Sequence, residues 1–99
     1  WASVYIDKLR RGETGRFRPR GNSMRGKIES GQLCTVVPVD DASALRVGDV
    51  VLCRVGRAEY LHWVTAIEAG RFRIANNVGR INGWIGPASV FGRCTNVED

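Results

Sequence analysis

The sequence is poor in proline and cysteine and has no long apolar run. Among its 99 residues are 3 prolines and 3 cysteines, against 12 glycines. The longest apolar stretches, Leu33–Val39 and Val50–Val55, are the length of a strand. A membrane-spanning helix needs ~20 apolar residues, so we expect no membrane span in this chain. Nor does the chain open with the pattern of a signal peptide.

The few cysteines exclude a disulfide framework. Cys34, Cys53 and Cys94 are an odd number, and no two of them have the spacing of metal ligands. Each lies among β-forming residues, where a free cysteine acts as a small buried hydrophobe. We therefore expect no metal and no cofactor. A reducing, cytoplasmic location fits this cysteine usage best.

Acidic side chains are scarce in the first quarter of the chain. Residues 1–27 carry eight basic and two acidic side chains, a net charge of +6, whereas the rest of the chain sums to −1. The basic residues are Lys8, Arg10, Arg11, Arg16, Arg18, Arg20, Arg25 and Lys27. Two interpretations stay open: a solvated face, or a surface that meets nucleic acid, lipid headgroups or an acidic protein partner.

The hydrophobic pattern predicts one mostly β domain over residues 1–99. Trp1, Val4, Tyr5 and Leu9 recur at helical spacing before Gly12, which predicts a short amphipathic helix within residues 1–12. A β core is expected over residues 17–97. The expected strands are Arg16–Arg20, Leu33–Val39, Val50–Val55, Glu59–Glu68, Arg71–Ala75, Ile81–Ile85 and Ser89–Val97. Short strands separated by glycine turns favour an antiparallel sheet, closed or half-closed like a small barrel.

Five motifs follow one another between residues 17 and 97. They are Gly21-Asn22-Ser23-Met24, Ser30-Gly31-Gln32-Leu33, Arg46-Val47-Gly48-Asp49-Val50-Val51-Leu52, Tyr60-Leu61-His62-Trp63-Val64 and Phe91-Gly92-Arg93-Cys94. Their order resembles the LexA/signal-peptidase superfamily. Its domains run from a Ser-Met turn through a Gly-Asp-Val-Val strand and a base-bearing strand to a terminal strand with a glycine. The resemblance implies a small coiled antiparallel sheet, or half-barrel, with serine peptidase activity.

The resemblance implies Ser23 as nucleophile and His62, the only histidine, as general base. A serine hydroxyl is a poor nucleophile at neutral pH and needs a base within hydrogen-bond reach. Bacterial members mostly use a lysine on this strand, but no lysine follows Lys27. The signal peptidases of the endoplasmic reticulum and of archaea use histidine at this position, and histidine titrates near neutrality.

The turn around Ser23 is expected to form the oxyanion and substrate pocket. Gly21 allows the backbone to bend, and backbone N–H groups of the turn are expected to receive an oxyanion. Gly21, Asn22 and Met24 are the residues expected to form this pocket, with Met24 lining its substrate side.

The sequence departs from the superfamily at two places near the site. The family often has proline two residues after the methionine, where this chain has Gly26. Relatives with a histidine base orient it with a downstream aspartate, whereas the matching stretch here, Ala75-Asn76-Asn77, holds no acid. Asn76 or Asn77 can orient His62 through a side-chain carbonyl, or simply form a polar turn. Asp49, at the start of its strand, is interpreted as structural.

We therefore predict a soluble serine endopeptidase that uses a Ser23/His62 dyad on itself or on a protein or peptide substrate. The only Ala-Gly pair, Ala69-Gly70, lies in an expected hairpin turn, so two possibilities stay open: a self-cleavage site upstream of Trp1, or action on another protein. Two alternatives stay open. One is a catalytically silent β domain that binds nucleic acid or an acidic partner through its basic segment. The other is part of a transcriptional regulator with a DNA-binding domain upstream.

Overall fold

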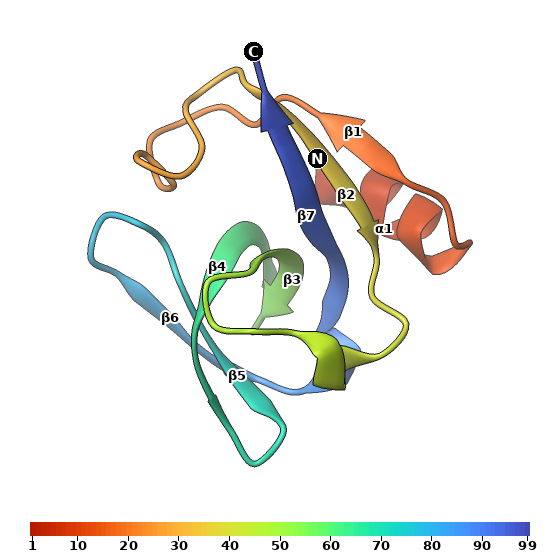
Figure 1. Cartoon of the computed structure of the whole chain (residues 1–99), viewed down its shortest axis with the longest axis vertical. Helices are drawn as coiled ribbons and strands as arrows, with labels where there is room; N and C mark the ends of the chain where they lie inside the picture. Colours follow the sequence, from red (N-terminus) through yellow and green to blue (C-terminus); the bar gives the residue numbers. More distant parts are fainter.

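Seven strands and one α-helix make up the computed structural model, which describes all 99 residues (Figure 1). In chain order they are α1 (Ala2–Arg10), β1 (Gly15–Phe17), β2 (Leu33–Pro38), β3 (Val50–Val55), β4 (Ala58–Glu68), β5 (Arg71–Ala75), β6 (Ile81–Ile85) and β7 (Val90–Glu98). Two 3₁₀ turns, Ala42–Ala44 and Pro87–Ser89, precede β3 and β7.

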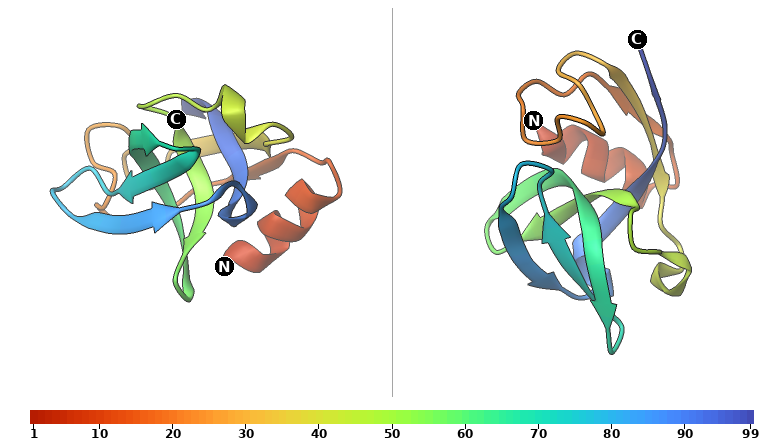
Figure 2. Two further views of the ribbon diagram at one scale, coloured as in Figure 1. Left: turned by 90° about the horizontal axis from the view of Figure 1, so that it is seen from below. Right: turned by 60° about the vertical axis from the view of Figure 1, so that its left-hand side comes forward.

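All seven strands belong to one antiparallel sheet with the order β1-β2-β7-β3-β4-β5-β6. The sheet coils strongly, so that α1 lies beside β1 and β2 at one end and the β5–β6 hairpin lies at the other (Figure 2). The edge strands β1 and β6 do not pair, so the sheet is not closed. The mostly β fold with a short N-terminal helix is confirmed.

The strand bounds follow the sequence prediction except at β1. β3, β5 and β6 have the expected bounds, β2 and β4 differ by one residue at one end, and β7 differs by one residue at each end. The edge strand expected over Arg16–Arg20 is present, but its bounds are wrong: it begins at Gly15, and its pairing with β2 stops at Phe17. Beyond it, the Pro19 carbonyl accepts the N–H of Gly31 and the Arg18 guanidinium donates to the Gly31 carbonyl, so this stretch pairs with a loop.

The helix ends where Gly12 predicts it, but it buries a different face from the one expected. The N–H of Gly12 bonds to the Leu9 carbonyl and that of Glu13 to the Lys8 carbonyl, with Gly12 at a φ of 79°, which is a Schellman stop. Ala2, Ile6 and Leu9 are buried, whereas Trp1 and Val4 are 65% and 60% exposed. The expected stripe of Trp1, Val4, Tyr5 and Leu9 is therefore corrected to one centred on Ile6.

Ala69-Gly70 forms the turn between β4 and β5, as expected. Both residues have positive φ, 49° and 73°, and Glu68 pairs with Arg71 across the turn. Two residues in the left-handed region match the right-handed twist of the flanking strands, as in a tight two-residue hairpin turn.

The interior holds two hydrophobic clusters that meet at β3. The first joins α1 to β1, β2 and the loop after β1, and it contains Leu52 of β3. The second lies between β3, β4, β5 and β6 and contains Val51 and Cys53. Successive side chains of a strand point to opposite faces, so β3 is buried on both sides and forms the wall between the clusters.

The three cysteines are free, and two of them are wholly buried. Cys34 and Cys53 are fully enclosed, as expected of small hydrophobes, whereas Cys94 is half-buried. Burial raises the pKa of the Cys53 thiol to about 12, which makes that thiol inert at neutral pH. No helix of the chain has the length and apolar character needed to cross a membrane.

Candidate active site

Ser23 lies at the tip of the loop that joins β1 to β2. The Met24 carbonyl accepts the N–H groups of Lys27 and Ile28, which closes a helical turn directly after the serine. Met24 and Ile28 are buried in the first cluster and anchor the loop, while Ser23 itself is exposed. Gly21 has a φ of 111°, so the turn that presents the serine requires glycine at that position, as expected.

Asn77 ties the serine loop to the β5–β6 turn. Its backbone N–H donates to the Ser23 carbonyl at 2.7 Å, and its side-chain amide donates to the Arg25 carbonyl at 2.8 Å. Gly26 lies beneath that amide with a φ of 96°, and a Cβ there would lie 3.0 Å from Asn77 Nδ2. Proline, with φ fixed near −65°, cannot adopt this conformation, so the turn excludes proline at this position.

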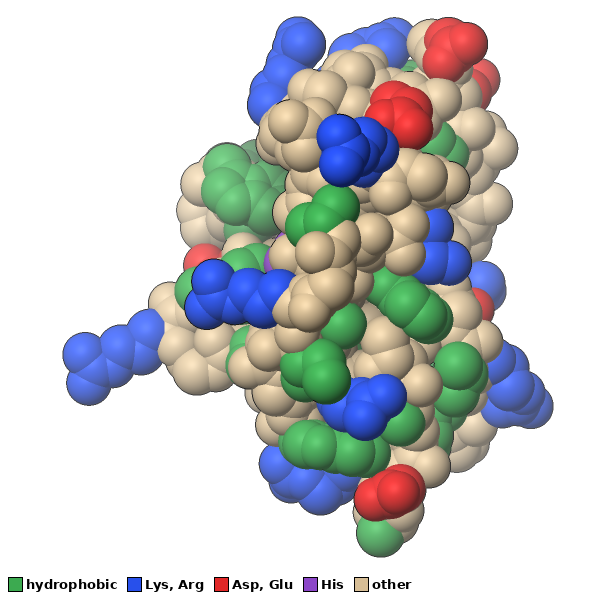
Figure 3. Space-filling view, turned by 90° about the vertical axis from the view of Figure 1, so that its left-hand side faces the viewer, with side chains coloured by type: hydrophobic (Ala, Val, Ile, Leu, Met, Phe, Trp, Pro, Cys, Tyr) green, Lys and Arg blue, Asp and Glu red, His purple; other side chains and the backbone are tan.

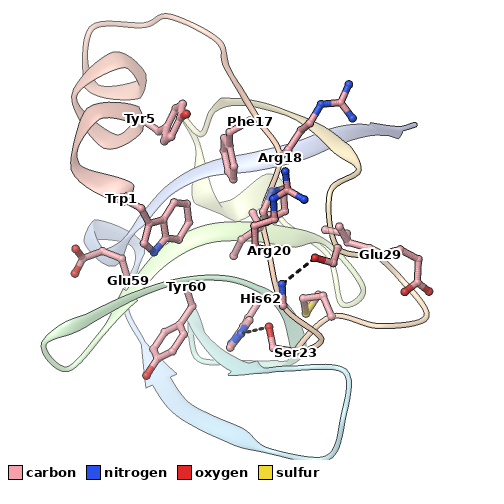
Figure 4. A pocket seen from close by; sticks show the side chains of 16 residues that line it. Trp1, Tyr5, Phe17, Arg18, Arg20, Ser23, Glu29, Glu59, Tyr60 and His62 are labelled. Carbon is pink, nitrogen blue, oxygen red and sulfur yellow. Dashed lines mark hydrogen bonds between the residues drawn. The ribbon is translucent and has the colours of Figure 1, made fainter.

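His62 reaches Ser23 from the middle of β4. The distance from its Nε2 to Ser23 Oγ is 3.3 Å, across 39 residues of sequence. In Figure 4 the two side chains point toward each other from strand and loop. His62 pairs with Val51 of β3, stacks on Tyr60 at 4.7 Å between ring centroids, and is only 6% exposed. Correspondingly little of the histidine is visible in the space-filling view (Figure 3).

The residue that orients His62 is Asn82, not Asn76 or Asn77. Asn82 Oδ1, on the edge strand β6, lies 2.7 Å from His62 Nδ1. Asn76 instead uses its side-chain oxygen to accept the N–H groups of Val78 and Arg80, which shapes the β5–β6 turn. Asn77 holds the serine loop as described above. The sequence prediction therefore had the correct residue type but the wrong asparagines, and the alternative that it left open, a polar turn, is the one that Asn76 forms.

The contact with Asn82 fixes the tautomer of His62. Because a carbonyl oxygen accepts a hydrogen bond, Nδ1 carries the proton and Nε2 is left as an acceptor that faces the Ser23 hydroxyl. Burial lowers the pKa of His62, the Asn82 hydrogen bond opposes this, and the positive charge of Arg80 adds to the lowering. The lowered pKa favours the neutral imidazole at pH 7, and the neutral form is the one that accepts a proton.

A cavity of about 480 Å³ opens on one side of the dyad. Trp1, Tyr5 and Phe17 form its aromatic wall, with Phe17 4.5 Å from the Tyr5 ring and 5.5 Å from the Trp1 ring (Figure 4). Gly21 and Met24 line it as expected, whereas Asn22 does not. Its charged lining residues are of both signs: Arg18, Arg20, Glu29 and Glu59. We call it the aromatic cavity.

A smaller cavity of about 270 Å³ opens on the other side, and we call it the polar cavity. It shares Ser23, Tyr60 and His62 with the aromatic cavity and adds three residues of the β5–β6 hairpin: Asn76, Arg80 and Asn82. Sequence reasoning missed Arg80, Asn82 and Tyr60. Of these, Tyr60 carried a local signal, since it lies two residues before His62 and thus on the same face of the strand.

Backbone donors are available beside the serine. The N–H groups of Asn22, Ser23 and Met24 donate to no acceptor within the protein, whereas Gly21 donates to the Ser30 hydroxyl at 3.1 Å. Unpaired N–H groups next to a nucleophile are the groups that stabilise an oxyanion in acyl transfer. The expected oxyanion role thus fits Asn22 through its backbone and not Gly21. Asp49, as expected, is structural: its carboxylate accepts the Arg46 N–H before β3.

No group of three or more histidine, cysteine or acidic side chains is close enough together to hold a metal ion. Comparison of the chain with protein-family models, with curated proteins and with solved structures finds no match.

Proposed function

We propose that this chain is a serine endopeptidase of the LexA/signal-peptidase type, with Ser23 as nucleophile and His62 as general base. The observation that carries the proposal is the 3.3 Å contact between Ser23 Oγ and His62 Nε2. Catalytic hydrogen bonds are often long before substrate binds, so this distance suits a resting dyad. The order of the five motifs supports the same assignment.

In the proposed acylation step, Ser23 Oγ attacks the carbonyl carbon of the scissile peptide while its proton passes to His62 Nε2. The carbonyl oxygen becomes an oxyanion, which the free backbone N–H groups of the Ser23 turn are placed to stabilise. As the intermediate collapses, the C–N bond breaks and His62 gives its proton to the departing amine. Water, deprotonated by His62 in the same way, then attacks the acyl carbon, and as the bond from that carbon to Ser23 Oγ breaks, His62 returns the proton to Ser23 Oγ.

Asn82 would serve this reaction by orienting the base. Its carbonyl oxygen keeps the proton on His62 Nδ1, so that Nε2 always faces the serine. An amide does so without the negative charge of an aspartate and stabilises the imidazolium less. The same division of roles exists in Cys-His-Asn proteases.

A fluorophosphonate probe tests the dyad directly, because it reacts with activated serines. Trypsin cuts after Arg20 and Arg25 and releases Gly21–Arg25, a peptide whose only hydroxyl is that of Ser23. We expect the label on this peptide at pH 7.5 and its complete loss in Ser23→Ala. His62→Ala should slow labelling by ~100-fold or more. Ser3→Ala, an exposed serine of α1 outside both cavities, is the matched control and should label as the wild type does.

Folded protein whose Ser23 stays unlabelled would contradict the peptidase proposal. The alternative function, binding of nucleic acid or an acidic partner, would then take its place. That alternative uses the basic segment, where Arg18 and Arg20 lie against Gly31 and line the aromatic cavity. Loss of binding with rising salt would identify it, because phosphate contacts release counterions.

A further inference from the structure

The two cavities are both lined by Ser23 and His62, and they differ in the residues that flank the dyad. The aromatic cavity is lined by the turn of the nucleophile, through Gly21 and Met24. The polar cavity is lined by Asn82, which supports the base, and by the turn that Asn76 shapes. During peptide hydrolysis the acyl part becomes bonded to the serine, and the departing amine takes its proton from the histidine. The acyl part therefore belongs on the aromatic side and the leaving part on the polar side.

Arg80 is the only charged residue that lines the polar cavity, because the His62 imidazole beside it is in its neutral form. Its guanidinium forms no salt bridge and no side-chain hydrogen bond with the protein. Its backbone is nevertheless fixed, since its N–H donates to Asn76 Oδ1 at 2.9 Å and its carbonyl accepts the N–H of Asn76 at 3.0 Å. A cation on a fixed turn, without an internal partner and next to the scissile position, is available to an anion on the substrate.

We propose that Arg80 is a specificity-determining residue that binds a carboxylate on the leaving side of the scissile bond. This inference rests on the proposed peptidase function. Arginine holds a carboxylate through paired N–H groups in a fixed plane, so it selects both charge and geometry. The aromatic cavity has no such bias, because its two arginines are accompanied by Glu29 and Glu59.

Two sources supply a carboxylate at this position, and they are distinguishable. One is an aspartate or glutamate side chain shortly after the scissile bond. The other is the C-terminal carboxylate of a leaving fragment only one or two residues long. Both place the same chemical group near Arg80, but only the first allows cleavage far from the end of a protein.

The test uses a library of internally quenched peptides, amidated at the C-terminus, in matched pairs with Asp or Asn at the first or second position after the cleaved bond. We expect the Asp member to have roughly tenfold higher kcat/KM in the wild type. A third set, with Asn and a free C-terminal carboxylate close to the cleaved bond, tests the second source. Preference for amidated Asp peptides assigns the side-chain source, and preference for free C-termini alone assigns the terminal source.

Three variants make the test specific to Arg80. Arg80→Gln should remove the Asp/Asn preference, and Arg80→Glu should reverse it toward Asn, because a carboxylate at residue 80 repels the Asp side chain. Arg57→Gln, an exposed arginine of the β3–β4 turn outside both cavities, should keep the wild-type ratio. Because each ratio is internal to one variant, a change in overall rate does not affect it. Thermal unfolding of each variant confirms that it is folded.

The outcomes separate the two proposals. Fluorophosphonate labelling of Ser23 and peptide hydrolysis, without any charge preference, would overturn the role of Arg80 and leave the peptidase standing. A preference that persists in Arg80→Gln would overturn it equally. If the folded protein showed no labelling of Ser23 and no peptide hydrolysis, this result would contradict the peptidase proposal. It would also remove the basis for a carboxylate on the leaving side.

Discussion

At the scale of single residues, the proposed chemistry depends on a histidine that is contacted at both nitrogens. Asn82 accepts from Nδ1 and Ser23 lies against Nε2, while Tyr60 covers one face of the ring. Burial lowers the pKa of the imidazole, which keeps it neutral at neutral pH. The site therefore needs no strongly desolvated lysine, because histidine is already a base in the required pH range.

The lowered pKa of His62 predicts where activity depends on pH. The base works only when neutral, so kcat/KM should be constant above the pKa of His62 and fall as the pH drops through it. Its midpoint should lie below ~6.5, the ordinary value for histidine. Asn82→Asp places a carboxylate beside Nδ1, which favours the imidazolium, so the midpoint should rise by about one unit or more.

The NMR titration is unambiguous because the chain has one histidine, so the spectrum contains a single histidine ring signal, that of His62. The midpoints from NMR and from kcat/KM should agree in both proteins. Asn96→Asp, an exposed asparagine of β7 outside both cavities, is the control and should leave the midpoint in place. A midpoint that does not move in Asn82→Asp would show that Asn82 does not contact the base in solution.

The limits of sequence reasoning at this scale follow from distance along the chain. Ser23 and His62 were predictable, because each lies in a local motif whose neighbours indicate a turn or a strand. Asn82 was not, because its contact with His62 depends on three strands. β6 pairs with β5 and β5 with β4, and register shifts interrupt both pairings near the site. No spacing in the sequence specifies those shifts.

At the scale of elements, β7 holds the sheet together by pairing with both β2 and β3, with α1 packed against it. Gly92 is the point of closest approach. A Cβ there would lie 2.6 Å from Val36 Cγ1, 2.8 Å from Leu9 Cδ1 and 2.8 Å from the Val37 carbonyl oxygen. The glycine therefore allows helix and strand to pack where any side chain would separate them.

Gly92→Ala should destabilise the protein by about 1–3 kcal/mol, the usual cost of overpacking a filled core. Because backbone as well as side chains border the site, little relaxation is available. Urea unfolding measures the effect. Gly86→Ala is the matched control: its φ is −90°, and its new methyl group would meet only Arg71 Nη1, at 3.8 Å. Equal stability of the two variants would contradict the close packing of α1 on β7.

The elements were largely predictable because alternation and glycine turns are local signals. The errors arose where tertiary contacts decide. Pro19 and Arg18 pair with Gly31 instead of extending β1. The buried face of α1 is determined by how the helix packs on the sheet and not by the size of its side chains. Ile6 is therefore buried, whereas the larger Trp1 lines the aromatic cavity.

At the scale of the whole molecule, the dyad joins the two hydrophobic clusters. The serine loop is anchored by Met24 and Ile28 in the first cluster. The hairpin that carries Asn82 packs on the second cluster through Ile74 and Ile85. Between them, His62 extends from β4, which pairs with β3, and β3 contributes side chains to both clusters. The site therefore exists only when both halves are folded, a dependence that no motif in the sequence expresses.

This arrangement predicts that the two clusters unfold together. β3 contributes Leu52 to one face and Val51 to the other, and all of its contacts with both clusters are lost at once if it leaves the sheet. Leu52→Ala should cost about 2–5 kcal/mol. Although the cavity lies in the first cluster, the loss should appear equally in the hydrogen-exchange protection of amides in β2 and in β5, because the slowest amides exchange only on global unfolding. Val51→Ala, on the opposite face, should also lower the hydrogen-exchange protection of the amides in both β2 and β5. Val78→Ala, at an exposed position of the β5–β6 turn, should change the protection of neither strand. If Leu52→Ala lowered protection in β2 alone, β3 would not couple the clusters, and the Ser23 loop could then detach from an otherwise folded base.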